Sequence, residues 1–74
     1  MNLGEIKNGS VVKVLSIDAG MRLFNRLASM GLSAGKTVTI VRNSGEGPVI
    51  VDLDGSRIAV GRGMAEKIFV ETIK

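Results

Sequence analysis

The stretch Val49-Ile50-Val51-Asp52-Leu53-Asp54-Gly55-Ser56-Arg57-Ile58-Ala59-Val60 predicts a tight β-hairpin, and this hairpin decides the class of the fold. Asp54-Gly55 favours a type I′ turn, because both central residues of that turn need positive φ angles. A two-residue loop fixes the register of the two strands. Apolar side chains then meet on one face, and an opposite-charge pair lies on the other. The predicted facing pairs are Leu53 with Ser56, Asp52 with Arg57, Val51 with Ile58, and Val49 with Val60.

Three further segments are typical of strands, which makes the chain mainly β. Val11 to Ile17 is so rich in β-branched and other apolar residues that we expect both of its faces to be covered. Thr37 to Arg42 and Ile68 to Ile73 alternate, and Pro48 begins the first hairpin strand, where a missing N–H does least harm. Five short strands predict a small closed or nearly closed barrel, because closure protects strand edges. The residues expected on its core include Leu3, Ile6, Val38, Ile40, Ile68 and Val70, with Phe69 facing outward.

A helical period replaces the strand pattern between Met21 and Met30. Polar residues recur three and four positions apart, and apolar residues occupy the opposite side. Asp18 is placed to cap the start of this helix. Gly31 is expected to end it in a left-handed conformation, with Leu32 at the position where such caps make an apolar contact. The polar stripe is Arg22, Asn25, Arg26 and Ser29, and the expected inward side is Leu23, Phe24, Leu27 and Ala28.

The composition contains no familiar catalytic or metal-binding constellation. The 74 residues give room for one domain, residues 1–74, and they include no Cys and no His. A disulfide framework and a cysteine zinc site are therefore excluded, and the commonest general base is absent. The seven acidic residues show no metal-ligand or calcium-loop spacing. We expect no enzymatic activity, no cofactor and no dedicated metal site.

A net charge of +3 invites a nucleic-acid interpretation. Lys and Arg are scattered and interleaved with acidic residues, which is typical of a solvated mixed surface. Small barrels that bind single-stranded nucleic acids stack bases on aromatic side chains, and Phe24 and Phe69 are the two aromatic residues of this chain. Nucleic-acid binding is therefore the less favoured of the alternatives.

The chain shows no signal for export or membrane insertion. Its apolar runs are short, and none approaches the ~20 residues that a membrane span needs. The first residues lack the basic start followed by an apolar stretch that marks a signal peptide. We expect a cytoplasmic protein that does not insert into a membrane by itself.

The run Arg26-Leu27-Ala28-Ser29-Met30-Gly31-Leu32-Ser33-Ala34-Gly35-Lys36 resembles the signature of the FeoA family. In that family, a helix carrying Arg-Leu and then Met-Gly is followed by a Leu-x-Pro-Gly turn and a strand. Met30 and Gly31 match the helix end, and Gly35 matches the turn glycine, for which we expect a positive φ angle. Further segments resemble the later family pattern in the same order, and the resemblance covers about Leu3 to Glu71. These segments are Thr39 to Arg42, Gly47 to Val51 with Pro48, Ile58 to Gly61, and Ala65 to Val70.

The resemblance implies an SH3-like five-stranded barrel with one short α-helix inserted after the first strand. It also implies a non-enzymatic, cytoplasmic accessory protein of bacterial ferrous-iron uptake. The implied partner is the cytoplasmic GTPase region of the FeoB transporter, which would recruit the protein to the inner face of the membrane. The same fold occurs in the C-terminal domains of iron-dependent repressors, so a transition-metal-linked regulatory module is an alternative.

The residues that we expect to meet a partner are Arg22, Asn25, Arg26 and Leu27. The first three lie on the polar stripe. Leu27 has two interpretations: it packs in the core beside Leu32, which is favoured, or it lines a partner pocket.

The sequence departs from the family pattern at two places. Ala34 stands where the family has proline before Gly35. The loop from Ser44 to Gly47 is shorter and more polar than the apolar Pro-Leu-Gly segment that relatives often carry.

Overall fold

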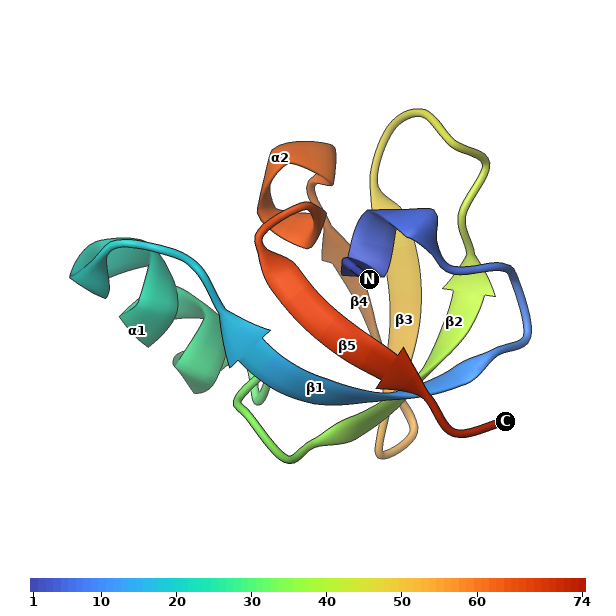
Figure 1. Cartoon of the computed structure of the whole chain (residues 1–74), viewed down its shortest axis with the longest axis horizontal. Coiled ribbons are helices and arrows are strands. Elements are labelled where there is room, and N and C mark those ends of the chain that lie inside the picture. Colours follow the sequence, from blue (N-terminus) through green and yellow to red (C-terminus); the bar gives the residue numbers. More distant parts are fainter.

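The computed structural model describes residues 1 to 74 and shows a strongly curved β-sheet with a helix set off to one side (Figure 1). The strands are β1 (Val11–Ile17), β2 (Thr37–Arg42), β3 (Val49–Leu53), β4 (Ser56–Val60) and β5 (Ile68–Thr72). The helices are α1 (Met21–Ser29), the short α2 (Arg62–Ala65) and a 3₁₀ turn, η1 (Leu3–Glu5). The predicted mainly β fold with one helix after the first strand is confirmed.

All neighbouring strands are antiparallel, and their order across the sheet is β4-β3-β2-β1-β5. The sheet curls until β5 lies in front of β3 and β4 in Figure 1. These two edges, β4 and β5, are not hydrogen-bonded to each other. Part of the β5 edge is covered by the N-terminus, since Asn2 bridges to Phe69 and the Val70 N–H donates to the Met1 carbonyl at 2.9 Å. The fold is the expected SH3-like barrel, open along the seam between β4 and β5.

The hairpin of β3 and β4 has the predicted register, from Val49 facing Val60 to Leu53 facing Ser56. Asp54 and Gly55 have φ angles of 53° and 88°. Both values are positive, as a type I′ turn requires. The Gly55 N–H also donates to the Asp52 carboxylate at 2.9 Å, which adds a hydrogen bond across the turn.

The core consists of fifteen buried side chains, all of them apolar. Alternation along the strands supplies most of them, and the N-terminal segment adds Leu3 and Ile6, as expected from the sequence. Each buried Val, Leu or Ile contributes about 1.5–3 kcal/mol of hydrophobic free energy, so this cluster is the main source of stability. Its members are Leu3, Ile6, Val12, Val14, Leu27, Leu32, Val38, Ile40, Val49, Val51, Leu53, Val60, Ala65, Ile68 and Val70.

β1 is covered on one face only, and the prediction that both faces are covered is wrong. Leu15 is 48% exposed, and Lys13 and Ser16 are exposed beside it. The register shifts at this point, because Val14 pairs with Val70 whereas Ser16 pairs with Phe69. Leu15 is the extra residue of this β-bulge, which turns its side chain away from the core.

α1 is attached to the core at its C-terminal end. Gly31 has a φ angle of +90° and donates its N–H to the Ala28 carbonyl at 3.0 Å. The Leu32 N–H donates to the Leu27 carbonyl at 2.9 Å. These two bonds form a Schellman motif, whose apolar contact joins the residues before and after the glycine. Leu27 and Leu32 are both fully buried, so the predicted glycine end of the helix is confirmed.

The start of α1 differs from the prediction, because Asp18 does not cap it. The N-cap is Gly20, which has no side-chain hydrogen bond. The Asp18 N–H instead donates to the Lys67 carbonyl at 2.8 Å and continues the pairing of β1 with β5. Strand pairing therefore holds Asp18 two residues before the N-cap.

The prediction of four inward-facing residues on α1 is wrong for two of them. Phe24 is 42% exposed and Ala28 is exposed. The inward side reduces to Leu27, which is fully buried, and Leu23, which is partly buried. Because the helix projects beyond the barrel, most of its apolar side chains find no covering element.

Gly31→Ala should destabilise the fold more than Gly35→Ala. The two glycines have nearly equal φ angles of 90° and 91°, so left-handed backbone costs either alanine about 1–2 kcal/mol. A Cβ atom on Gly31 would lie 2.7 Å from Leu53 Cδ2, whereas nothing lies within 4 Å at Gly35. Overpacking should lower the free energy of unfolding of Gly31→Ala by about 1–3 kcal/mol more. Urea unfolding measures both variants, and equal losses would contradict this account of the helix end.

Candidate functional site

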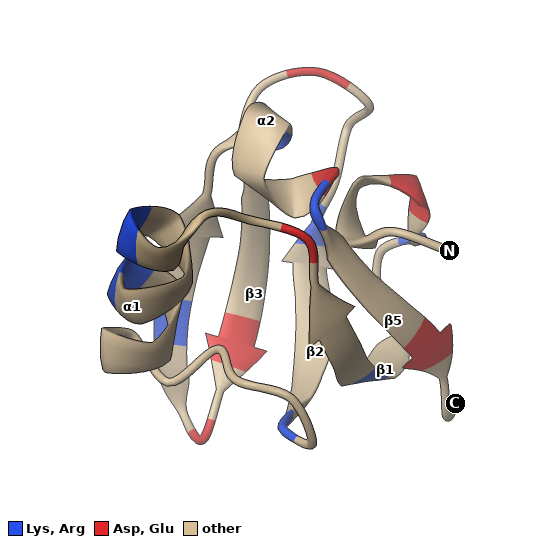
Figure 2. Cartoon of the chain, turned by 60° about the vertical axis from the view of Figure 1, so that its left-hand side comes forward, with Lys and Arg blue, Asp and Glu red and all other residues tan.

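α1 stands away from the sheet and presents basic side chains to solvent. Figure 2 shows its Lys- and Arg-coloured turns on the outer side, with no acidic residue along the helix. Arg22, Asn25 and Arg26 are all exposed. The Ser29 hydroxyl donates to the Arg26 carbonyl at 2.8 Å, so the last member of the polar stripe bonds to the helix end. Two permanent positive charges therefore project from one short helix.

Leu27 differs from the other three residues proposed for partner contact. Its side chain is fully buried. It anchors α1 in the core and offers no surface to a partner.

Exposed apolar side chains accompany the arginines on α1. Met21 is 74% exposed and Phe24 is 42% exposed, and Ala28 is exposed as well. Spacings of three and four residues place these side chains on one side of the helix. Apolar side chains gathered on an exposed helix are a feature of interaction surfaces, because water is a poor environment for them. We call Met21, Arg22, Phe24, Asn25, Arg26 and Ala28 together the α1 surface.

A hydrogen-bonded cluster joins three segments that are distant in the sequence. The Arg62 guanidinium donates to the Gly47 carbonyl at 3.0 Å, to the Gly4 carbonyl at 3.0 Å, and to Asn43 Oδ1 at 2.8 Å. Asn43 Nδ2 donates to the carbonyls of Gly4 and Ile6 at 2.9 and 2.8 Å. The N-terminal segment, the loop after β2 and α2 are thereby fastened together.

Sequence reasoning missed this cluster. Asn43 follows the predicted strand from Thr37 to Arg42, and Arg62 lies between two predicted strands, so the sequence pattern assigns neither residue a role. Arg62 bonds to a residue 58 positions away. No short-range pattern carries information about a contact of that separation, and both residue types are common in loops.

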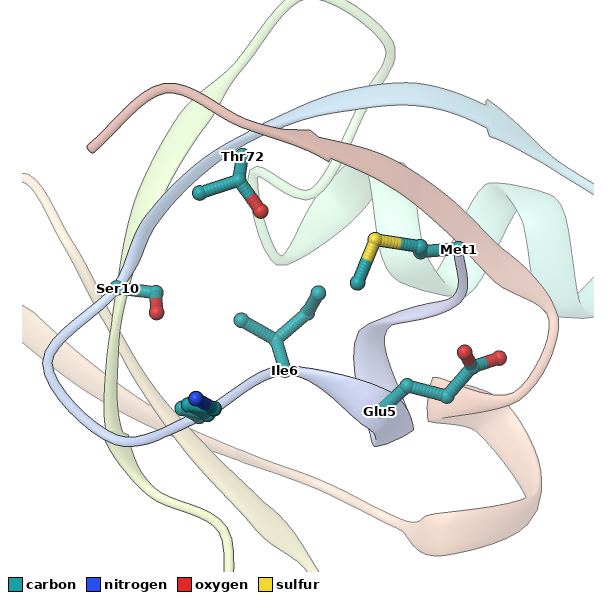
Figure 3. A pocket seen from close by; sticks show the side chains of 6 residues that line it. Met1, Glu5, Ile6, Ser10 and Thr72 are labelled. Carbon is teal, nitrogen blue, oxygen red and sulfur yellow. The ribbon is translucent and has the colours of Figure 1, made fainter.

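Two shallow cavities lie outside the α1 surface. One of about 220 Å³ lies between the N-terminal segment and the end of β5. Figure 3 shows Ile6 at its centre and Met1 at one side. The other, of about 320 Å³, lies beside the loop after β2. The first is lined by Met1, Glu5, Ile6, Lys7, Ser10 and Thr72, and the second by Arg42, Ser44, Glu46, Pro48 and Ile50.

The chain contains no group of three or more His, Cys, Asp or Glu residues placed to hold a metal ion. None of its helices has the length and apolarity needed to cross a membrane.

Comparison with known proteins assigns the family. The FeoA domain model matches residues 1–72. The chain belongs to the FeoA domain family. It is 49% identical over 65 residues to a Methanocaldococcus jannaschii protein that is named for Fe(2+) transport. The match covers 88% of this chain and 78% of that relative.

Solved structures agree with this assignment. The crystal structure of an iron uptake regulatory protein, FeoA, matches with a TM-score of 0.93 and 32% identity, over 99% of this chain and 97% of that one. A manganese-dependent transcriptional repressor in complex with manganese contains a similar unit, with a TM-score of 0.88 and 25% identity. The match spans 99% of this chain but 36% of the repressor, so the fold occurs there as one part of a longer protein.

The signature that resembles the FeoA family marks the joint between α1 and β2. Met30 is the C-cap of α1 and packs partly buried against the core. Gly35 has the expected positive φ angle and donates its N–H to the Val14 carbonyl at 2.8 Å. Pro48 is exposed and lies one residue before β3, rather than within it. Met30 and Gly35 therefore contribute to the fold, whereas Arg22 and its exposed neighbours form a surface.

Asn43→Ala should destabilise this FeoA domain more than most substitutions in a loop do. It removes the donor to the Ile6 carbonyl, one of two donors to the Gly4 carbonyl, and the side-chain acceptor of Arg62. Part-buried groups left without partners should lower the free energy of unfolding by about 1–3 kcal/mol. Ser44→Ala is the control, because it removes one exposed hydrogen bond to the Glu46 carbonyl and should cost about 0.5 kcal/mol or less. Urea unfolding compares the two, and similar losses would show that the cluster is not structural.

Proposed function

We propose that this FeoA domain is a non-enzymatic accessory protein of ferrous-iron transport that binds the cytoplasmic region of an FeoB-type membrane transporter. Membership of the FeoA family supports the link to iron, as does the M. jannaschii relative named for Fe(2+) transport. The observation that carries the binding role is the α1 surface, in which exposed apolar and basic side chains share one helix. The protein would act in the cytoplasm, at the inner face of the membrane when bound.

The chemistry of the α1 surface specifies the complementary partner surface. Arg22 and Arg26 are permanently charged and suit carboxylates, which they can bind through paired N–H donors. Met21 and Phe24 supply apolar area that a partner would remove from water. We therefore expect an acidic patch with an apolar centre on the cytoplasmic region of the transporter.

The attachment of α1 favours binding without rearrangement. Leu27 is fully buried, and the Schellman bonds fix the helix end. A surface already held in its binding geometry loses little conformational entropy on association. The arginines are thus presented by a helix whose base is set by the core.

Arg26→Glu should weaken binding to the isolated cytoplasmic region of the transporter by about tenfold or more, because it reverses a charge that faces an acidic patch. The affinity of the wild-type protein should fall as salt rises, since exposed charges are screened. Titration calorimetry at two salt concentrations measures both effects.

Arg57→Glu is the matched control, because Arg57 is an exposed arginine on β4, outside the α1 surface. It makes the same change in net charge and should leave the affinity almost unchanged. Equal losses for the two variants would remove α1 from the interface. Absence of binding by the wild-type protein, with and without guanine nucleotide, would overturn the proposed function.

A further inference from the structure

The outer face of β1 and β5 carries side chains in three rows. Lys13 and Glu71 face each other in the middle row. Leu15 lies at the bulge opposite Phe69 in one flanking row. Val11 and Ile73 form the other row, where the Ile73 N–H donates to the Val11 carbonyl at 2.7 Å. We call these six residues the β1–β5 face; its two strands run side by side in Figure 1.

The β1–β5 face is uncovered. Leu15 is 48% exposed, Ile73 49% and Phe69 36%. Lys13 and Glu71 are also exposed, and Val11 is half-buried. Three large apolar side chains thus surround one pair of opposite charges on the outside of the barrel.

We propose that this face binds the same face of a second copy of the chain. An interface between identical copies related by a twofold axis must be complementary to itself. A twofold axis parallel to the strands, between β1 and β5, places β1 of one copy over β5 of the other. Lys13 then meets Glu71 of the second copy, and Glu71 meets its Lys13.

The flanking rows obey the same symmetry. The axis that pairs the charges also places Leu15 over Phe69 of the second copy, and Val11 over its Ile73. Two sheet faces with apolar side chains pack about 10 Å apart with their strands nearly aligned. Every row is therefore matched by one operation.

The charges distinguish this face from the α1 surface. α1 carries Arg22 and Arg26 and no acidic residue, so two copies meeting there would repel each other. The β1–β5 face carries one charge of each sign, which is what self-association needs. Six side chains per copy form a small interface, so we expect a weak, concentration-dependent dimer.

This inference does not rest on the proposed function. The dimer involves strands rather than α1, and the sedimentation experiment that tests it uses this chain alone. A failure of one proposal therefore leaves the other standing.

Sedimentation equilibrium of the purified chain between about 10 µM and about 1 mM tests the dimer, because small interfaces associate in this range. The apparent mass of the wild-type protein should rise towards twice that of the monomer. Lys13→Glu and Glu71→Lys should each remain monomeric, because each places like charges across the interface. An equimolar mixture of these two variants should dimerise, since every cross-copy pair is then opposite in sign.

Matched controls separate the interface from general charge effects. Lys7→Glu and Glu46→Lys make the same exchanges at exposed positions off the β1–β5 face and should dimerise like the wild type. Lys13→Glu/Glu71→Lys keeps opposite charges both within and between copies and should also dimerise. Thermal unfolding followed by circular dichroism verifies that each single variant, which has like charges facing across β1 and β5, stays folded.

Three outcomes would overturn the proposal. The first is a wild-type protein that stays monomeric at 1 mM. In that case, hydrogen exchange in the presence of the transporter's cytoplasmic region would show whether the transporter protects the Leu15 and Phe69 amides. That protection would assign the face to the transporter. The second is a dimer insensitive to both charge reversals, and the third is failure of the two folded single variants to associate when mixed.

Discussion

The contact between Gly31 and Leu53 is the constraint on which the arrangement of this protein depends. It joins the end of α1 to the hairpin of β3 and β4. A glycine is required there twice over, because its φ angle is +90° and a Cβ atom would lie 2.7 Å from Leu53 Cδ2. The same left-handed residue directs the chain so that Leu27 and Leu32, on either side of it, both enter the core. One residue therefore links the helix, the turn into β2 and the hairpin.

This mode of attachment explains why most of α1 is exposed. The helix is held by its last turn, and Leu27 is its one fully buried residue. A helix lying along the barrel would have to bury Phe24 and Ala28, whereas a helix held at its end leaves them exposed. The core gains one fully buried leucine, and the surface gains a projecting helix with two exposed arginines.

Side-chain hydrogen bonds fasten segments that strand pairing does not join. β4 and β5 are edges of the sheet. Arg62 and Asn43 donate hydrogen bonds to backbone carbonyls of the N-terminal segment and of the loop after β2. These carbonyls therefore have hydrogen-bond partners although no strand pairs with them. The N-terminus covers the β5 edge where Asn2 meets Phe69. The outer face of β1 and β5 remains uncovered, and its balanced charges set it apart from the purely basic α1.

The sequence by itself determined the features that short-range physics controls. The Asp54-Gly55 turn and its register, the helix end at Gly31 and the alternation of β2 and β5 all depend on neighbouring residues, and all were predicted. The exposed positions of Arg22, Asn25 and Arg26 follow from the same helical period. Tertiary structure alone decided which apolar side chains found a covering element. Leu15 and Phe24 are as apolar as Leu27, but burial depends on what the rest of the chain places opposite each residue. The hydrogen bonds of Arg62 and Asn43 could not be predicted for the same reason, since contacts between residues up to 58 positions apart leave no local sequence pattern. Asp18 was wrongly predicted as a helix cap because its pairing with Lys67 also depends on a distant segment.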